Sequence, residues 1–371
     1  MVPVPTVVDA GCNQPSFIAI KSFDDGHPLI STRSAHRILI MSQGIPVIDL
    51  APIFTGYAEG KRQVAAEVGC ALETVGFFHI VGHDVPGELV RQLRDEAYKF
   101  FALPIEEKMK VRRPAPEITR GYDPPAQQSL SATQGEVSPS DLQEGFGMGG
   151  FDFASDDPYY NTGLGHYFFA PNLWPAEPSA LRSALEQYHT ALKSLATKIM
   201  QVFALALDLD EDFFNNKVDK TGAHIRLNKY PAQPKPPEPG QLRSGAHTDY
   251  GTLTILFGED TPGGLQVMGP RGEWTDIHPT PGSFIVNIGD SMARWTNDRW
   301  VSTLHRVVNP PREHAASERL SVAFFHAANY DTELRCLKSC EIPGELPKYE
   351  STYYAAYYID KLMKSRQTVA A

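Results

Sequence analysis

The chain has 371 residues, of which 42% are hydrophobic and 21% charged, so it can bury a sizeable core in one large or two medium domains. Its formal net charge is -10 and it has no long run of Lys or Arg, which argues against nucleic acid or an anionic membrane as the main partner. No apolar stretch approaches the length of a membrane span, and four cysteines are too few for a disulfide scaffold. These features favour a cytoplasmic globular protein.

Residues 1–40 differ in composition from the rest of the chain. They contain four prolines and show no sustained hydrophobic period. No basic segment precedes an apolar run, and the early acidic residues Asp9, Asp24 and Asp25 argue against a secretory or transit peptide. Met41 opens a stretch that looks like a natural beginning. We therefore expect residues 1–40 to be a disordered extension.

Short strands and helices alternate in the next part of the chain. Strands are predicted at 45–50 and 76–82, and helices at 61–74 and 86–101, from apolar spacing and flanking glycines and prolines. Residues 112–177 are rich in Pro, Gly, Ser and Asp, and loops of this length are usually functional or disordered. Aromatic residues such as Tyr122 and Phe146 are therefore candidates to close over a substrate, with packing on the main body as the alternative for each.

A long helix is predicted at about 179–207, because apolar residues recur there at helical spacing. After it, residues 223–330 form short apolar runs separated by Gly- and Pro-rich turns. This pattern is typical of an antiparallel sandwich, barrel or jelly roll. Two helices are expected near the end, between about 348 and 363.

The stretch 245–257 reads as a loop that leads into a strand, and it contains His247 and Asp249. Residues two apart in a strand point to the same side, so these two side chains should converge. A His and a carboxylate make two thirds of the 2-His-1-carboxylate set of non-haem Fe(II) oxygenases. His305, which follows Asp249 by 56 residues in a predicted strand, is the candidate third ligand. His278 and His314 lie in a turn and a polar loop, and are expected to be exposed.

Arg319 and Ser321 share one face of the next predicted strand. A planar guanidinium beside a hydroxyl suits bidentate capture of a carboxylate. The alternative is that Arg319 extends from a strand edge into solvent.

With these motifs in place, the chain resembles the iron(II)/2-oxoglutarate-dependent dioxygenases, and more narrowly the isopenicillin N synthase-like branch, which includes plant flavonoid and hormone dioxygenases. The resemblance covers about residues 41–360. It is carried by the order H-x-D, His, R-x-S and by further segments at 45–50, 76–80, 226–231, 263–267, 286–290 and 302–307.

The resemblance implies a mainly β fold with flanking helices, in which a double-stranded β-helix (jelly-roll) core packs on N-terminal and central helices. It implies an N-terminal dioxygenase region with substrate-side loops at 41–155, a strut helix at 178–210, the catalytic jelly roll at 220–330 and a helical tail at 331–371. It also implies Fe(II) on His247, Asp249 and His305, and 2-oxoglutarate on Arg319, Ser321 and Tyr230. O2 would be the further co-substrate, with succinate and CO2 as products of 2-oxoglutarate.

Strand alternation extends this assignment. If Tyr230 faces the site, Asn228 and Arg226 on the same strand should face it too. If Arg319 and Ser321 face it, so should Phe325. Arg226 and Phe325 are therefore candidate substrate contacts. The alternative for Arg226 is a pairing with a structural carboxylate.

Several functions remain open on the sequence. The leading one is oxidation, by hydroxylation or desaturation, of a small organic metabolite. A 2-oxoglutarate-independent oxidase or cyclase of the isopenicillin N synthase type would keep the same motifs. A binding protein without catalysis is disfavoured because all three candidate ligands are present, and a zinc hydrolase is disfavoured because no H-E-x-x-H occurs. The substrate and the oligomeric state are not predicted.

Overall fold

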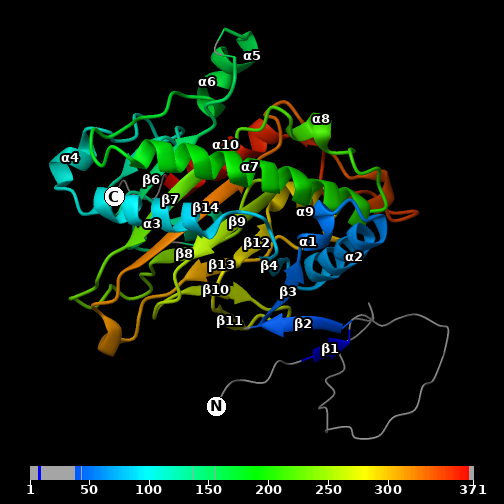
Figure 1. Ribbon diagram of the computed structural model, residues 1–371, viewed down its shortest axis with the longest axis horizontal. Coiled ribbons are helices and arrows are strands. Elements are labelled where there is room, and N and C mark those ends of the chain that lie inside the picture. The colour runs from blue at the N-terminus through cyan, green and yellow to red at the C-terminus, as the bar shows by residue number, and fades with distance from the viewer. Residues whose placement is uncertain (1–6, 10–37, 43, 137, 155, 367–371) are drawn as a thin grey trace, which may run out of the picture.

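A large mixed sheet frames the protein in this computed structural model, which describes residues 7–9, 38–42, 44–136, 138–154 and 156–366 (Figure 1). In the described part of the chain its ten strands lie in the order β1-β2-β3-β4-β12-β9-β14-β7-β6-β5, and every neighbouring pair is antiparallel except β3 with β4. The strands are β1 (Val7–Asp9), β2 (Ile38–Ser42), β3 (Ile45–Asp49), β4 (Phe77–Val81), β5 (Gly121–Asp123), β6 (Glu144–Gly149), β7 (His224–Tyr230), β9 (Leu253–Gly258), β12 (Phe284–Ile288) and β14 (Arg319–His326).

A smaller sheet faces the large one. Its described strands lie in the order β11-β10-β13-β8, and a separate pair is formed by β15 and β16. The bounds of these strands are β8 (Ser244–His247), β10 (Leu265–Met268), β11 (Trp274–Ile277), β13 (His305–Val307), β15 (Glu333–Leu334) and β16 (Thr352–Tyr353).

Helices cover the outer face of the large sheet. The longest, α7, runs across that face with α2 and α3 beside it (Figure 1). The helices are α1 (Ala51–Phe54), α2 (Ala58–Thr74), α3 (Gly87–Phe101), α4 (Ile105–Met109), α5 (Pro158–Asn161), α6 (Gly165–Phe168), α7 (Leu181–Ala206), α8 (Asn215–Val218), α9 (Asp290–Trp295) and α10 (Tyr354–Arg366), with short 3-10 turns at Leu130–Gln134, Arg312–His314 and Lys338–Cys340. Although α7 has 26 residues, neither it nor any other described helix has the apolar length to cross a membrane.

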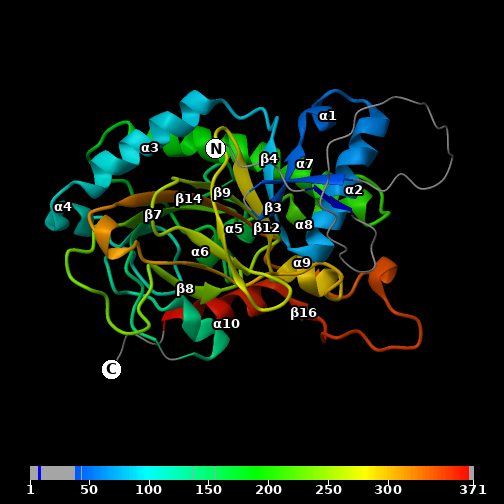
Figure 2. The same cartoon turned by 90° about the horizontal axis from the view of Figure 1, so that it is seen from below.

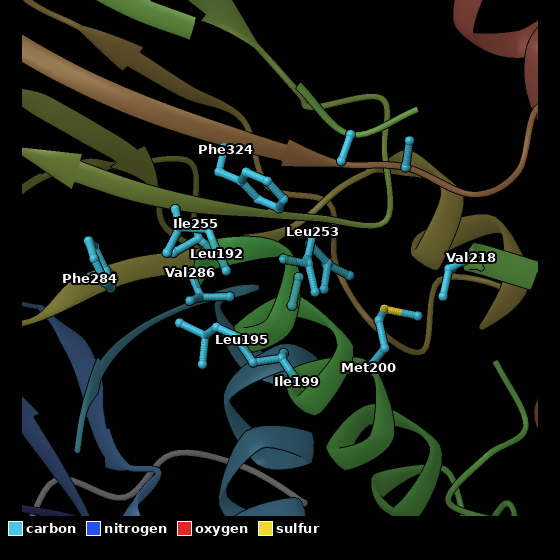
Figure 3. Close-up of a cluster of buried hydrophobic side chains, with 14 of the residues drawn as sticks. Leu192, Leu195, Ile199, Met200, Val218, Leu253, Ile255, Phe284, Val286 and Phe324 are labelled. Atoms are coloured by element: carbon cyan, nitrogen blue, oxygen red, sulfur yellow. The ribbon is translucent and has the colours of Figure 1, made fainter. Parts of the chain in front are cut away.

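The alternation of side chains along the strands creates two different faces. Leu253 and Ile255 of β9, like Val286 of β12 and Phe324 of β14, point outward and pack on α7 (Figure 3). From α7 they meet Leu192, Leu195 and Ile199, which recur at helical spacing. This apolar layer fixes which residues of the same strands must point inward.

The inward residues face the smaller sheet. A compact apolar cluster joins the two sheets near one end, with Phe77 and Ile285 from the large sheet and Leu265, Val267 and Ile277 from the small one. Two facing sheets with helices on the outside are the jelly-roll architecture expected from the sequence, so the fold class is confirmed.

Two parts of the chain differ from the sequence expectations. Between about 348 and 363, where two helices were expected, the structure has one, α10, which is preceded by the short strand β16. Within residues 1–40, β1 and the start of β2 are strands, while 1–6 and 10–37 lie outside the described residues, so the expected disorder there stays a prediction.

Several aromatic residues of segment 112–177 pack on the protein itself. Tyr159 stacks on Tyr330 with ring centroids 4.3 Å apart, and Phe153 and Tyr160 pack against Phe169. Packing on the main body, one of the two alternatives for these residues, is what the structure shows.

Candidate active site

A pocket opens between the two sheets, and α10 forms one of its walls. The large sheet contributes the inward residues of β7, β9 and β14, and the small sheet contributes β8 and β13. Tyr354, Tyr358, Leu362 and Arg366 line it from α10. In Figure 2, α10 and β8 lie on the side of the molecule away from α3.

Three potential metal ligands meet in this pocket. His247 at the end of β8 lies directly opposite His305 at the start of β13 in the antiparallel ladder. Asp249 follows on the loop after β8, with Oδ1 3.9 Å from His247 Nε2 and 3.7 Å from His305 Nε2. Among the described residues this is the one group of three or more His, Cys, Asp or Glu arranged to hold a metal ion. The predicted convergence of the three side chains is confirmed.

Hydrogen bonds orient each of these side chains. His247 Nδ1 lies 2.7 Å from the Gly245 carbonyl oxygen and His305 Nδ1 lies 3.1 Å from that of Thr303, so each ring can donate from Nδ1 and direct its Nε2 lone pair at the centre. Asp249 Oδ2 accepts from Thr254 Oγ1 at 2.6 Å and from Asn287 Nδ2 at 2.7 Å, which leaves Oδ1 facing the imidazoles.

The protonation states also suit a cation. Burial, reinforced by the neighbouring His305, lowers the pKa of His247 to about 4, so its imidazole is neutral at pH 7. Burial opposes ionisation of Asp249, but the two histidines and the hydrogen bonds from Asn287 and Thr254 lower the pKa of its carboxyl below the usual value. Two histidines and one carboxylate are the donor set of non-haem iron sites.

A buried arginine lies beyond the three ligands. Arg319 is 2% exposed, and its guanidinium stacks near the Tyr230 ring, 5.3 Å from the ring centroid. Its Nε donates to the Glu259 carbonyl, but Nη1 has no hydrogen-bond partner among the described residues. Ser321 Oγ lies 3.5 Å from the Tyr230 hydroxyl. A buried, unpaired guanidinium edge beside two hydroxyls fits a carboxylate ligand.

The backbone makes room for this guanidinium. Gly258 of β9 pairs with Ser321, and a Cβ at Gly258 would lie 2.7 Å from Arg319 Nη2. Glycine at this position therefore allows the arginine side chain to lie flat across the neighbouring strand.

The predicted alternation along β7 and β14 is confirmed. Arg226, Asn228 and Tyr230 line the pocket from β7, and Phe325 lines it from β14. Arg226 also makes the alternative contact, since its Nη1 donates to Asp123 Oδ2 at 2.6 Å. His278 and His314 are exposed, as expected.

Tyr122 and Phe146 do not line the pocket, which corrects the expectation that they contact substrate. They pair across β5 and β6 and point to the outer face, where both rings pack against Phe100 of α3. Both are fully buried, and the Tyr122 hydroxyl donates to Glu144. Their neighbours Asp123 and Gly145 occupy the pocket face of the same strands.

Sequence reasoning missed two groups of residues. Asp290 Oδ2 accepts hydrogen bonds from Thr248 Oγ1 and from the Tyr357 hydroxyl, and it forms a salt bridge with Lys361 Nζ at 3.2 Å. One carboxylate therefore connects the loop of the candidate metal site to α10. The pocket face of α10 was missed as well. Its signal was the four-residue spacing of Tyr354, Tyr358, Leu362 and Arg366, which places these side chains on one side of a helix.

Comparisons with known proteins agree with this geometry. A family model described as the N-terminal region of non-haem dioxygenases in morphine synthesis matches residues 45–177, and the 2OG-Fe(II) oxygenase superfamily model matches residues 221–328. The 2-oxoglutarate-Fe(II) type oxidoreductase hxnY of Emericella nidulans is 37% identical over 310 residues, 82% of this chain and 85% of that protein. The homoarginine-6-hydroxylase 2-ODD-233 of Oryza sativa is 33% identical over 86% of this chain and 97% of that protein.

Solved structures of proteins from the same superfamily also align with this chain. A putative 2OG-Fe(II) oxygenase family protein from Caulobacter crescentus aligns with a TM-score of 0.74 and 30% identity, covering 87% of this chain and 99% of that one. JOX2, solved in complex with 2OG, Fe and JA, aligns with a TM-score of 0.71 and 27% identity over 87% of this chain and 86% of that one.

The chain therefore belongs to the 2OG-Fe(II) oxygenase superfamily, in its isopenicillin N synthase-like branch. It is a non-haem iron dioxygenase that uses Fe(II), 2-oxoglutarate and O2 to oxidise a small metabolite.

Proposed function

We propose that His247, Asp249 and His305 hold the Fe(II) ion of this dioxygenase. The observation that carries the assignment is that the outer polar atom of each side chain is hydrogen-bonded to the protein, whereas the inner one is not. The outer atoms, Nδ1 of each histidine and Oδ2 of Asp249, are engaged by the fold, while the inner atoms face one another. This arrangement, in which Nε2 of each histidine and Oδ1 of Asp249 remain available, is typical of metal ligands and is not expected of residues with a purely structural role.

The distal carboxylate of 2-oxoglutarate is assigned to Arg319, Ser321 and Tyr230. The buried Arg319 Nη1, which lacks a partner among the described residues, gains one when a carboxylate binds. The two hydroxyls supply further donors to the same anion.

Iron with 2-oxoglutarate and O2 supplies oxidative decarboxylation, with succinate and CO2 as products. The residues of the chain bind the substrate and exclude water. The apolar walls formed by Leu256, Phe325 and the tyrosines of α10 exclude water and hold an organic substrate beside the three ligands. The proposed reaction is hydroxylation or desaturation of this substrate, carried out in the cytoplasm.

The experiment is an anaerobic incubation of the protein with Fe(II), 2-oxoglutarate and a panel of metabolites, followed by O2. Succinate and a product shifted by one oxygen or two hydrogens are expected by mass spectrometry. Absence of iron-dependent succinate under all conditions would contradict the function. Substrate oxidation without succinate would instead identify a 2-oxoglutarate-independent oxidase.

A further inference from the structure

Three arginines surround one carboxylate at the end of the pocket away from Arg319. Arg226 Nη1 lies 2.6 Å and Arg366 Nη1 3.7 Å from Asp123 Oδ2, while Arg113 Nη1 lies 3.0 Å from Asp123 Oδ1. All four side chains are at most 15% exposed. Guanidinium groups stay protonated at neutral pH, so the cluster carries two more positive than negative charges.

The surplus charge lies on the pocket side. Arg226 and Arg366 line the pocket, whereas Arg113 approaches Asp123 from outside it. The Arg366 side chain is 5% exposed, and in the described part of the chain its Nε and Nη1 have no hydrogen-bond partner. Buried guanidinium N–H groups that lack a hydrogen-bond acceptor are costly, which indicates that a ligand supplies one.

The other nearby carboxylates are engaged elsewhere. Asp141 accepts hydrogen bonds from the backbone amides of Gly245 and Leu130. Glu144 Oε2 accepts from Lys108 and from the Tyr122 hydroxyl on the opposite face of the sheet. The fold itself therefore offers Arg366 a single carboxylate, which Arg226 already contacts at shorter distance.

The position of this cluster suits the far end of a substrate. Arg226 is four residues from Tyr230 along the pocket face of β7, which corresponds to about 13 Å at the usual strand rise. Phe325 lies one step beyond Arg226 along the sheet, because Ala323 pairs with Arg226 and Phe325 with His224. Phe325 also pairs with Thr254, whose hydroxyl donates to Asp249. A molecule held at Arg226 and lying against Phe325 would thus extend toward the candidate iron ligands.

The neighbouring strand is shaped around Arg226. A Cβ at Gly145 of β6 would lie 2.7 Å from Arg226 Nη2 and 2.9 Å from Cζ. Arg226 Nε donates to Asn228 Oδ1 at 2.8 Å, so the guanidinium is held flat over Gly145 with its position fixed.

We propose that the substrate of this dioxygenase carries a carboxylate that bridges Arg226 and Arg366, with its apolar, ring-sized portion against Phe325. Arg366 thereby makes α10 a specificity-determining element. This inference rests on the proposed function, because that function assigns Arg319 to 2-oxoglutarate and leaves the opposite end for the substrate.

The test measures binding of small acids and their matched neutral amides to the protein loaded anaerobically with Fe(II) and saturating 2-oxoglutarate. Saturation keeps the probes away from Arg319. The pairs are benzoate with benzamide, phenylacetate with phenylacetamide and indole-3-acetate with its amide, and the readout is isothermal titration calorimetry. For at least one pair the acid is expected to bind about tenfold or more tightly than the amide, since charged hydrogen bonds are involved.

Arg366→Gln and Arg226→Gln are each expected to reduce this acid-over-amide ratio to near one. Because the ratio is internal to each protein, a change in the folded fraction does not alter it. The matched control is Lys364→Ala, which removes an exposed cation from the same helix and should leave the ratio unchanged.

Absence of any acid preference in the wild-type protein, including absence of binding by every acid, would overturn the inference. So would a ratio that survives in both arginine variants. In either case iron-dependent succinate formation without probe would show that the proposed function stands, whereas loss of 2-oxoglutarate binding and of succinate would show that the function itself is wrong.

Discussion

The two ends of the pocket are built alike. At one end Arg319 lies over Gly258 of the adjacent strand, and at the other end Arg226 lies over Gly145. In both cases the residue two positions after the arginine, Ser321 or Asn228, pairs with that glycine. Each end thus presents a flat, immobilised guanidinium to the same cavity.

The ends differ in how their charge is balanced. No ion pair of Arg319 occurs among the described residues, so its charge is available to a ligand. Arg226 is held by Asp123, and the available charge comes from Arg366 on a different element, α10. The geometry of the proposed 2-oxoglutarate end is therefore determined by one sheet, whereas that of the proposed substrate end depends on how α10 packs against the sheet.

The largest effect is expected at the proposed metal ligands. Asp249→Ala removes the charged ligand and should reduce iron-dependent succinate formation to below about 1% of wild type, a larger loss than removal of an outer hydrogen-bond partner would cause. Fe(II) binding by equilibrium dialysis checks the cause. Asp276→Ala, on an exposed position of β11, is the control and should retain activity. Substantial iron binding by Asp249→Ala would refute the assignment.

At the 2-oxoglutarate end, Arg319→Lys should weaken 2-oxoglutarate binding by about ten- to a hundredfold, or roughly 1.5–3 kcal/mol, because Lys cannot reproduce the planar fork. Calorimetric titration measures the affinity for 2-oxoglutarate. The acid-over-amide ratio of the substrate probes should not change. Arg271→Lys, on a side chain that is 81% exposed, provides the control. Unaltered 2-oxoglutarate affinity would show that Arg319 has another role.

Substitution of Gly258 and of Gly145 tests the two ends of the pocket independently. Gly258→Ala should displace Arg319 and weaken 2-oxoglutarate binding about fivefold, while Gly145→Ala should displace Arg226 and lower the acid preference by a similar factor. Gly258→Ala should leave the acid preference unchanged, and Gly145→Ala should leave 2-oxoglutarate binding unchanged. Gly264→Ala, where the nearest atom would be 3.8 Å from the new Cβ, is the matched control. Equal damage to both ligands by either variant would mean that the ends are not independent.

The smallest effect concerns pH. Burial, with help from Arg120 and Arg226, lowers the pKa of His224 to about 3, so this pocket residue is neutral from pH 6 to 8. Burial raises the pKa of Asp141 to about 7, so its growing negative charge opposes an anion as pH rises. Carboxylate affinity should therefore fall by no more than about threefold between pH 6 and 8. A tenfold rise per unit of acidification would indicate a histidine in the anion site.

Sequence reasoning placed Arg319 and Phe325 on the pocket face because strand alternation is a local rule and both residues lie in β14. The predicted grouping of His247 and Asp249 was also found, although β8 ends at His247 and Asp249 lies on the following loop. Sequence reasoning did not reach the faces of β5 and β6, since these short strands lie in a Gly- and Pro-rich segment where no apolar pattern separates the pocket side from the helix side. Tyr122 and Phe146 were misplaced for this reason.

The location of Arg366 at the pocket could not be predicted from the sequence for a different reason. The spacing of 354, 358, 362 and 366 places Arg366 on one face of α10, but only tertiary packing brings that face over the pocket and near Asp123. The pairing of Arg226 with Asp123 likewise joins residues 103 apart in the chain.

The shared carboxylate of Asp290 gives this arrangement a thermodynamic consequence. It contacts Tyr357 and Lys361 of α10 and also Thr248, the residue between the candidate iron ligands His247 and Asp249. If an anion at Arg366 favours the packed position of α10, and iron at His247 and Asp249 favours this loop conformation, both ligands stabilise the same contact. By linkage the two ligands should strengthen each other's binding by an equal factor, so that iron affinity itself reports whether a true substrate is present.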